Sequence, residues 1–479
     1  MTTTGSPLSA PSPEIVQRLA AIVGAEHALT DPAMQQPYLV EWRDKYRGRT
    51  PLVLRPGTTE EVSRILAVAD ALRVGVVPQG GNTGLVGGQI PFEAGTEIVL
   101  SLSRLNRVRR LDAAGGSVTV EAGVTLAAVR ALAAEADRLF PMNLPSEGSC
   151  QIGGNLATNA GGASVLAYGT MRDLVLGLEV VLADGRVWDG LRSLRKDNTG
   201  YDLRDLFIGS EGTLGVITAA VLKLWPRPRE TATAMLALGS MEGALDILQR
   251  MQARFGAALT AFEFIPAIAM AFLERHVPDA KSPFAAVHPW QVLLELSSPV
   301  ADGATAAALA EALAAQLACG LVIDARVAAS DRQAREMWRL REAISEVQKF
   351  EGGSIKHDVS VPIALLPEFV ARADAIVARV IPGARPVPFG HFGDGNVHYN
   401  VSQPVGAERA AFLARWEPLS REIHDLVSAL GGSISAEHGI GRMKRDELSR
   451  AKSAVELDLM RSVKAALDPN GILNPGKLL

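Results

Sequence analysis

Two histidines flank a turn-forming dipeptide in the segment FGHFGDGNVHYNV (389–401). Its central Asp-Gly pair favours a two-residue type I′ turn between antiparallel strands. His391 and His398 stand three residues to either side of this pair, so the pattern predicts that they face each other, with Cβ atoms about 5 Å apart. Asn400 falls on the same face, because side chains alternate along a strand. Two imidazoles and a carboxamide that point together suit a divalent cation such as Zn, with Mn or Fe as alternatives.

A second polar cluster, SAEHGIGR (435–442), supplies the groups that such a site still needs. Glu437 offers a carboxylate ligand, and His438 offers a side chain that can move protons. Adjacent side chains point to opposite faces of a straight strand, so both can serve one site only where the backbone turns, which the glycines that follow allow. The alternative is that the hairpin histidines form an ordinary hydrogen-bonded surface pair without a metal.

The segment WRLREAISEVQKFEGGSIKHDVSVP (338–362) carries charged side chains that suit an anion. It starts as a helix in which Trp338, Arg341 and Ser345 share one face, and a strand headed by Lys356 follows the Gly-Gly break. Arginine binds a carboxylate in bidentate fashion, so these side chains form a reasonable carboxylate clamp. The alternative is a solvated charged helix without a ligand.

Glycine is abundant, with 45 residues in the chain of 479, and three clusters hold much of the first half's share. They are GGNTGLVGG (80–88), GSCQIGGNLATNAGG (148–162) and NTGYDLRDLFIGSEGTLGVIT (198–218). Dense glycine permits close backbone approach, so that successive N–H groups can converge on an anion such as a diphosphate. One cluster alone is equally compatible with plain turns. Three clusters interleaved with Asn, Thr and Glu favour a large polar cofactor.

Simple nucleotide motifs are absent from the chain. No G-x-G-x-x-G opens a helix after the strand GVVPQ (75–79), which argues against a doubly wound dinucleotide fold. The tail segment GILNPGK (471–477) lacks the Ser or Thr and the helix of a P-loop. A formal charge of −4 indicates no nucleic-acid partner. With 48% hydrophobic and 21% charged residues, the composition is that of a globular protein with an ample core.

Five segments, in this order, resemble the FAD-binding elements of the vanillyl-alcohol oxidase and p-cresol methylhydroxylase superfamily. They are RPGTTEEV (55–62), VPQGGNTGLVGG (77–88), CQIGGNLATNAGG (150–162), YDLRDLFIGSEGTLGVIT (201–218) and LDPNGILNPGK (467–477). The second half of the chain resembles the hydroxy-acid dehydrogenase branch of that superfamily. Several members attach the flavin through a His of the first glycine loop, where this chain has Asn82 and no nearby His or Cys. The resemblance therefore implies non-covalent FAD.

The resemblance also implies which residues contact FAD. The diphosphate is expected on the first glycine loop, with further contacts from the other two clusters and from the tail. The implied residues are Pro78, Gly80, Gly81, Asn82, Thr83, Gly84, Leu85, Gly88, Pro145, Ser149, Gly153, Gly154, Asn155, Thr158, Gly161, Gly162, Glu211, Ile217 and Asn474.

Site roles in the second half of the chain follow from the same resemblance. The implied metal ligands are His391, His398 and Glu437. The implied substrate contacts are Arg341, Ser345, Lys356, Asn400 and His438. His438 is also the implied general base. The clamp positions match residues that bind substrate carboxylates in D-2-hydroxyglutarate dehydrogenases.

The activity implied by the resemblance is the FAD-dependent oxidation of D-2-hydroxyglutarate to 2-oxoglutarate, with hydride transfer to FAD and metal-assisted proton abstraction. D-lactate or another D-2-hydroxy acid, including the substrate of a glycolate-oxidase-like subunit, is the alternative. A non-catalytic flavin-binding subunit would not need a base beside metal ligands. A metallohydrolase is a third option, which a yellow colour of the purified protein would exclude.

An α+β scaffold is expected to position these residues. The first half alternates helical and strand patterns, beginning with a helix over 59–74 whose capping residue is Thr59, and a proline-rich break in LWPRPRET ends it. By resemblance, we expect a two-subdomain FAD-binding domain of the p-cresol methylhydroxylase type (1–228). An α/β substrate or cap domain with an antiparallel sheet and the metal hairpin follows (229–425), and a C-terminal segment returns to the FAD domain (426–479).

The N-terminal segment MTTTGSPLSAPSPE (1–14) shows neither a signal sequence nor an Arg-rich transit peptide and is expected to be a short disordered leader. Two cysteines without a CxxC pair suggest a reducing compartment. We therefore expect a cytoplasmic enzyme, with peripheral association at the inner membrane as an option. The alanine-rich stretch 303–323 is expected to be a helix followed by a strand.

Partners are also implied by the resemblance. We expect a small 2-hydroxy acid as substrate and an electron-transfer flavoprotein or a quinone as electron acceptor. A homodimer is expected, and nucleic acid is not.

Overall fold

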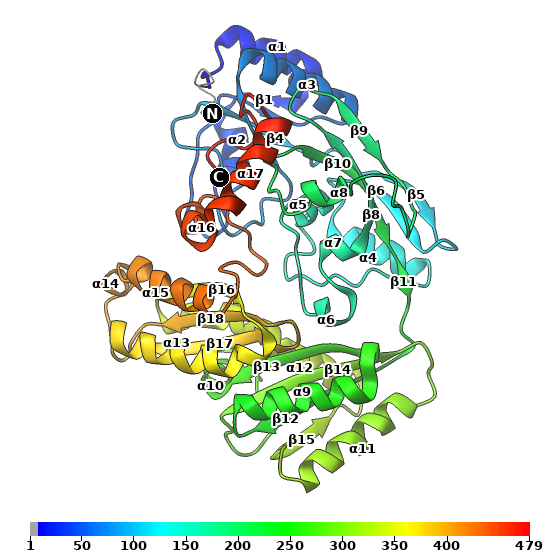
Figure 1. Ribbon diagram of the computed structural model, residues 1–479, viewed down its shortest axis with the longest axis vertical. Coiled ribbons are helices and arrows are strands. Elements are labelled where there is room, and N and C mark those ends of the chain that lie inside the picture. Colours follow the sequence, from blue (N-terminus) through cyan, green and yellow to red (C-terminus); the bar gives the residue numbers. More distant parts are fainter. Residues whose placement is uncertain (1–7) are drawn as a thin grey trace. The chain divides into compact units, whose positions relative to one another are not determined.

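A computed structural model describes residues 8–479, which form two compact units (Figure 1). The first unit consists of the residues up to Gly161, Thr170–Pro226 and His438–Leu479. The second unit consists of Gly162–Gly169 and Arg227–Glu437. From the sequence, we expected domain boundaries between residues 228 and 229 and between residues 425 and 426. The roles assigned to the parts stay predictions.

The first sheet of the first unit has the order β1-β2-β4-β3. Strands β2, β4 and β3 run parallel, and β1 pairs antiparallel with β2. The strands are β1 (Ala28–Leu29), β2 (Val53–Leu54), β3 (Gly75–Gln79) and β4 (Glu97–Ser101). The helices are α1 (Pro13–Val23), α2 (Pro32–Leu39) and α3 (Thr59–Leu72). Helix α1 begins at Pro13, so the last two residues of the expected leader 1–14 are helical, and residues 1–7 of that leader lie outside the described part of the chain.

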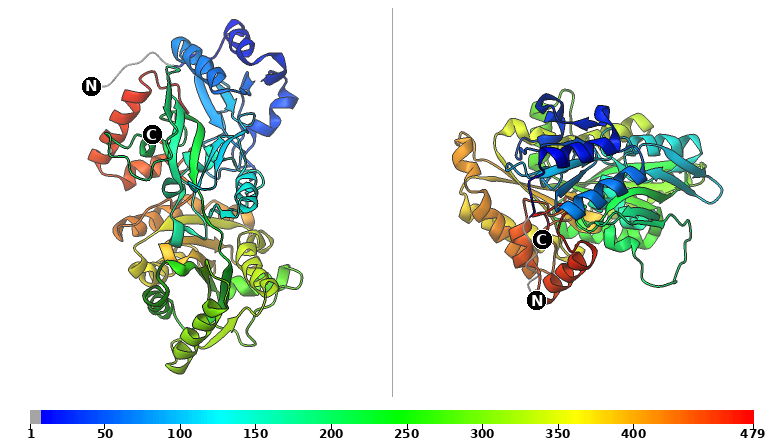
Figure 2. Two further views of the ribbon diagram at one scale, coloured as in Figure 1. Left: turned by 90° about the vertical axis from the view of Figure 1, so that its right-hand side faces the viewer. Right: turned by 90° about the horizontal axis from the view of Figure 1, so that it is seen from above.

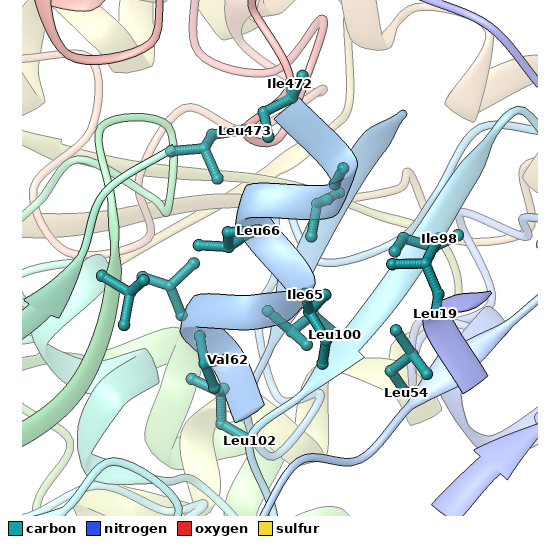
Figure 3. Close-up of a cluster of buried hydrophobic side chains, with 14 of the residues drawn as sticks. Leu19, Leu54, Val62, Ile65, Leu66, Ile98, Leu100, Leu102, Ile472 and Leu473 are labelled. Atoms are coloured by element: carbon teal, nitrogen blue, oxygen red, sulfur yellow. The ribbon is translucent and has the colours of Figure 1, made fainter. Parts of the chain in front are cut away.

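Helix α3 buries one apolar stripe against this sheet (Figure 3). Its buried residues Val62, Ile65, Leu66 and Ala69 recur at helical spacing. The helix is capped by Thr58, whose side chain accepts a hydrogen bond from the backbone N–H of Glu61, so the expected cap at Thr59 is wrong by one residue. Ile472 and Leu473 of the C-terminal segment, coloured red in Figure 2, lie in the same core.

The second sheet of the first unit is antiparallel, with the order β5-β6-β10-β8-β9. Its strands are β5 (Val108–Asp112), β6 (Ser117–Glu121), β8 (Val175–Val181), β9 (Val187–Gly190) and β10 (Val216–Lys223). Strands β7 (Arg138–Leu139) and β11 (Trp225–Pro226) form a separate pair. The helices are α4 (Leu126–Glu135), α5 (Ile152–Ala157), α7 (Met171–Leu174), α8 (Arg204–Phe207), α16 (Arg445–Ala451) and α17 (Ala454–Leu467).

The second unit is built on a seven-stranded antiparallel sheet with the order β15-β12-β14-β13-β17-β18-β16. The strands are β12 (Glu230–Leu238), β13 (Leu259–Pro266), β14 (Trp290–Ser298), β15 (Asp324–Val327), β16 (Ser354–Ser360), β17 (Arg385–His391) and β18 (Asn396–Ser402). The helices are α6 (Val165–Tyr168), α9 (Met241–Phe255), α10 (Ala267–His276), α11 (Ala304–Ala318), α12 (Asp331–Val347), α13 (Leu366–Val380), α14 (Arg409–Leu413) and α15 (Trp416–Ala429). The expected α+β class with an antiparallel sheet in the second part is confirmed.

Opposite faces of this sheet are covered by different helices. Helices α10 and α12 pack over one face in an apolar cluster that includes Phe272, Leu340 and Phe389. Helices α13 and α15 cover the other face, where Tyr399 and His357 hydrogen-bond to them. The face under α12 carries the candidate site.

The alanine-rich stretch forms α11 and ends at Ala318, and β15 begins only at Asp324. The helix was expected, whereas the expected strand begins only after the stretch 303–323. Across residues 8–479, we find no helix with both the length and the apolar character needed to span a membrane.

Candidate metal and flavin sites

The histidine hairpin is formed by β17 and β18, but its register differs from the one expected. His391 pairs with Asn396, and Phe389 pairs with His398, because a four-residue loop replaces the two-residue type I′ turn. Phe392 is fully buried in this loop and packs edge-on against aromatic rings of β13, which widens the turn. The direct pairing of the two histidines was therefore wrong. The prediction that they lie on one face was correct, because the register is shifted by an even number of residues.

The structure brings His391, His398 and Glu437 together. One ligand atom from each of the three lies within 4.8 Å of the others. The imidazole rings meet edge to face with centroids 5.4 Å apart, and His391 Nε2 lies 3.7 Å from Glu437 Oε1. Glu437 is held there by its backbone N–H, which donates to Asp358 Oδ2 on β16 at 2.9 Å.

Glu263 on β13 is a site residue that the sequence interpretation missed. Its Oε1 lies 2.7 Å from His391 Nδ1, and its Oε2 accepts from Arg341 Nε at 2.8 Å. Burial opposes ionisation, but the charges of His391 and Arg341 outweigh it and hold the pKa of Glu263 below its ordinary value. Burial also opposes charge on His391, yet Glu263 and Glu437 raise the pKa of His391 to about 9. A charged residue in the otherwise uncharged and mostly apolar strand LTAFEFIP was the available signal.

The chemistry of this donor set fits a divalent cation. Burial, reinforced by nearby carboxylates, raises the pKa of Glu437 to about 7, and His391 opposes this rise. A cation that binds the Glu437 carboxylate favours its ionised form. An imidazole whose Nδ1 faces a carboxylate presents Nε2 to a metal, as in carboxylate–histidine–zinc arrangements.

His438, the expected base, follows Glu437 directly and is partly buried. Gly439 and Gly441 have φ values of +82° and +52°, so the backbone is not an extended strand here. The turn that the two adjacent side chains require is therefore present in the chain.

Four of the expected substrate contacts, Arg341, Ser345, Lys356 and Asn400, belong to the second unit and hydrogen-bond there to other residues of the chain. Arg341 on α12 is buried against Glu263. Lys356 on β16 donates from Nζ to the backbone carbonyl of Ser345 at 3.2 Å, which brings these two together. Asn400 pairs with Lys356 across the strands and donates from Nδ2 to Gln348 Oε1 at 2.9 Å. Gln348 was not anticipated from the sequence.

The glycine clusters pack against one another in the first unit. A Cβ added to Gly81 would lie 1.9 Å from the carbonyl oxygen of Ser149, so the first two clusters touch through their backbones. Asn474 Nδ2 donates to the carbonyl oxygen of Glu211, which joins the tail to the third cluster. All expected FAD contacts belong to the first unit except Gly162, which belongs to the second unit.

Three buried acceptors around these loops fit a polar ligand. Asn82 Oδ1, Gln151 Oε1 and Asn474 Oδ1 have no hydrogen-bond partner among residues 8–479. An unmet buried polar atom is costly, whereas the hydroxyl and N–H groups of FAD can satisfy it. At Gly154, an added Cβ would meet no atom within 4 Å, so the backbone there is open to a ligand.

Glu211 has a further structural role. Its carboxylate accepts from the backbone N–H groups of Ile440 and Gly441 at 2.7 and 2.8 Å. The side chain therefore stabilises the turn that follows His438.

Two family models cover most of the chain. The model "FAD linked oxidases, C-terminal domain" matches residues 227–478, and the model "FAD binding domain" matches residues 50–190. The chain belongs to the FAD-linked oxidase family. The expected dependence on FAD is thereby confirmed.

Curated relatives of this FAD-linked oxidase are dehydrogenases. A D-2-hydroxyglutarate dehydrogenase of Bos taurus is 41% identical over 479 residues, covering 99% of this chain and 85% of the relative. One of Xanthomonas citri pv. viticola is 40% identical over 462 residues, covering 96% of each. A Schizosaccharomyces pombe protein that carries the name of a D-lactate dehydrogenase is 37% identical, covering 97% and 90%. The chain is an FAD-dependent hydroxy-acid dehydrogenase, as expected.

Solved structures support the expected fold. The chain matches p-cresol methylhydroxylase with a TM-score of 0.76 at 16% identity, covering 97% of this chain and 96% of the other. It matches an alkyldihydroxyacetonephosphate synthase with a TM-score of 0.73 at 18% identity, covering 99% and 88%. At these identities the likeness concerns the fold, and the p-cresol methylhydroxylase type is confirmed.

The expected cytoplasmic location is contradicted. Relatives from Bos taurus, Rattus norvegicus and Danio rerio are named as mitochondrial enzymes. The expectation rested on the first residues of the chain and on its two cysteines.

Proposed function

We propose that this FAD-linked oxidase oxidises D-2-hydroxyglutarate to 2-oxoglutarate. The proposal rests on one observation: the sheet face that carries His391 and His398, with Glu437 beside them, also meets Arg341 and Lys356. A site for a cation beside two basic side chains suits a substrate with a second carboxylate. The relatives named D-2-hydroxyglutarate dehydrogenase support the same substrate.

The metal ligands in this proposal are His391, His398 and Glu437. Zinc is the first choice, with manganese or iron as alternatives, because three ligands of this kind are typical of catalytic zinc sites that keep a position for substrate. A bound cation supplies Lewis acidity toward the hydroxyl group of the substrate.

FAD is held non-covalently by the glycine clusters in this proposal. Backbone N–H groups of the loop from Gly80 to Gly84 bind the diphosphate, and the buried acceptors of Asn82, Gln151 and Asn474 hydrogen-bond to the cofactor. Bound FAD supplies a two-electron acceptor for hydride.

The residues of the chain then bind the substrate and move one proton. Arg341, Ser345 and Lys356 hold the distal carboxylate, and Asn400 orients the substrate. His438 accepts the C2 hydroxyl proton on its imidazole. The C2–H bond breaks with its electron pair leaving as hydride, and the C2–O bond becomes a carbonyl.

The decisive experiment is anaerobic bleaching of the flavin with D- and L-2-hydroxyglutarate, D-lactate and D-malate. Bleaching fastest with D-2-hydroxyglutarate is the expected result. Faster bleaching with D-lactate would favour the second candidate, which the Schizosaccharomyces pombe relative supports. A protein that no hydroxy acid bleaches would contradict the proposal.

We propose that an electron-transfer flavoprotein or a quinone reoxidises the flavin. We also propose that the enzyme is a homodimer. Stopped-flow reoxidation with each acceptor and sedimentation equilibrium test these two points.

A further inference from the structure

A single buried carboxylate lies between the metal ligands and the basic side chain expected to bind substrate. Glu263 is in the middle of β13, whose eight residues are all buried, and its side chain is 1% exposed. An isolated charge in such a strand is costly unless it is paired and hydrogen-bonded. Glu263 meets this requirement with both oxygens, one on His391 and the other on Arg341.

The first oxygen fixes the orientation of His391. A carboxylate 2.7 Å from Nδ1 favours the proton on that nitrogen. The other ring nitrogen, Nε2, lies 3.7 Å from Glu437 Oε1 and is the one that remains to bind a cation. Such an outer partner both orients an imidazole ligand and increases its basicity.

The second oxygen fixes the orientation of Arg341. It takes the Nε–H of the guanidinium, and the same guanidinium stacks over the ring of Phe389 with its central carbon 5.0 Å from the ring centroid. Because Nε is hydrogen-bonded to Glu263 and the guanidinium lies over Phe389, the two Nη groups remain to bind a carboxylate in bidentate fashion. The side chain is therefore prepared for an anion before one arrives.

We propose that Glu263 is a shared positioning residue that sets the metal ligand His391 and the anion-binding Arg341 with one carboxylate. This inference rests on the proposed function and identifies what links its two halves: binding of the cation and recognition of the distal carboxylate depend on the same side chain. Glutamine has the same shape but only one acceptor oxygen, so it cannot serve both donors. Replacement by glutamine should therefore impair both.

The test compares the flavin-loaded wild type with Glu263→Gln. Competition with a chromophoric chelator measures the affinity for Zn²⁺, which should fall by roughly 10–100-fold. With zinc restored to saturation, KM for D-2-hydroxyglutarate should still be raised by about tenfold or more, because Arg341 is no longer held. KM for D-lactate, which lacks the distal carboxylate, should change little under the same conditions.

Glu295→Gln is the matched control. Glu295 is on the neighbouring strand β14, where it accepts from Trp338 Nε1 and Thr233 Oγ1, and it contacts neither His391 nor Arg341 through a hydrogen bond within residues 8–479. Its zinc affinity and its KM ratio should match the wild type. If Glu263→Gln fails to fold, as judged by flavin content and thermal unfolding, Glu263→Asp takes its place in both measurements.

Two results would overturn the inference. Unchanged zinc affinity in the Glu263 variant would remove its role at the metal, and an unchanged KM for D-2-hydroxyglutarate at saturating zinc would remove its role at Arg341. A wild type that does not oxidise D-2-hydroxyglutarate would instead refute the proposed function, while the zinc measurement would still decide whether Glu263 positions His391.

Discussion

Two glycines of the loops that we propose to bind flavin should respond to the same substitution in opposite ways. At Gly81, a Cβ would lie 1.9 Å from the carbonyl oxygen of Ser149 and 2.8 Å from its carbon. Backbone atoms cannot rotate away, so Gly81→Ala should destabilise the flavin-free protein by about 1–3 kcal/mol. At Gly154, inside helix α5, a Cβ meets no atom within 4 Å. Gly154→Ala should therefore stabilise the flavin-free protein by about 0.5–1 kcal/mol, the usual gain from alanine in a helix.

The open space at Gly154 is where we expect FAD to approach the backbone. Gly154→Ala should consequently weaken FAD binding by at least about tenfold, or about 1.4 kcal/mol, although it stabilises the flavin-free protein. Thermal unfolding of the deflavinated protein measures the change in stability, and a flavin fluorescence titration measures the affinity for FAD. A Gly154→Ala protein that binds FAD with wild-type affinity would refute the assignment of this loop to the cofactor. A Gly81→Ala protein of unchanged stability would refute the close packing of the two loops.

Three further predictions concern the base, the metal and acid stability. His438→Ala should retain its flavin but slow anaerobic flavin reduction by roughly 10²–10⁴-fold, and reduction at the wild-type rate would exclude His438 as the base. Chelation should abolish substrate-dependent bleaching without releasing FAD, and zinc should restore it; activity that persists after complete metal removal would rule out a catalytic metal. Burial alone would raise the pKa of Glu179, but hydrogen bonds from Arg109, Thr59 and Thr218 hold it below its ordinary 4.5. This carboxylate therefore stabilises the fold above pH 4.5 and loses that contribution as the pH falls through its lower folded pKa, so thermal unfolding of Glu179→Gln should vary less with pH in this range.

The hairpin shows how far local sequence determines a site. The turn-forming dipeptide indicated two strands, and the alternation of side chains placed His391 and His398 on one face, which the structure has. The register depended on Phe392, which packs against Phe262 and Phe264 of a strand about 130 residues earlier in the chain. No local pattern encodes that contact. The prediction was correct in the choice of face and wrong in the pairing.

The hydrogen-bond partners of the site residues were harder to predict from the sequence than the site residues themselves. Arg341 was identified from its helical spacing, but its hydrogen bond to Glu263 joins positions 78 residues apart. Glu211 was expected to contact the cofactor, and the backbone N–H groups of Ile440 and Gly441 that its carboxylate accepts from were not anticipated. Contacts of this kind depend on tertiary packing, and a single sequence carries only the weak signal of a charge in an apolar strand.

The short helix α6 has a consequence for building chimeric enzymes. Residues Gly162–Gly169 belong to the second unit although their neighbours in the chain belong to the first, and Leu166 packs beside Gly393 in the loop of the histidine hairpin. The unit that carries the proposed metal ligands is therefore encoded in two separate stretches. Exchanging only Arg227–Glu437 with a relative would combine a hairpin from one enzyme with a supporting helix from another. A graft intended to transfer substrate preference has to include both stretches.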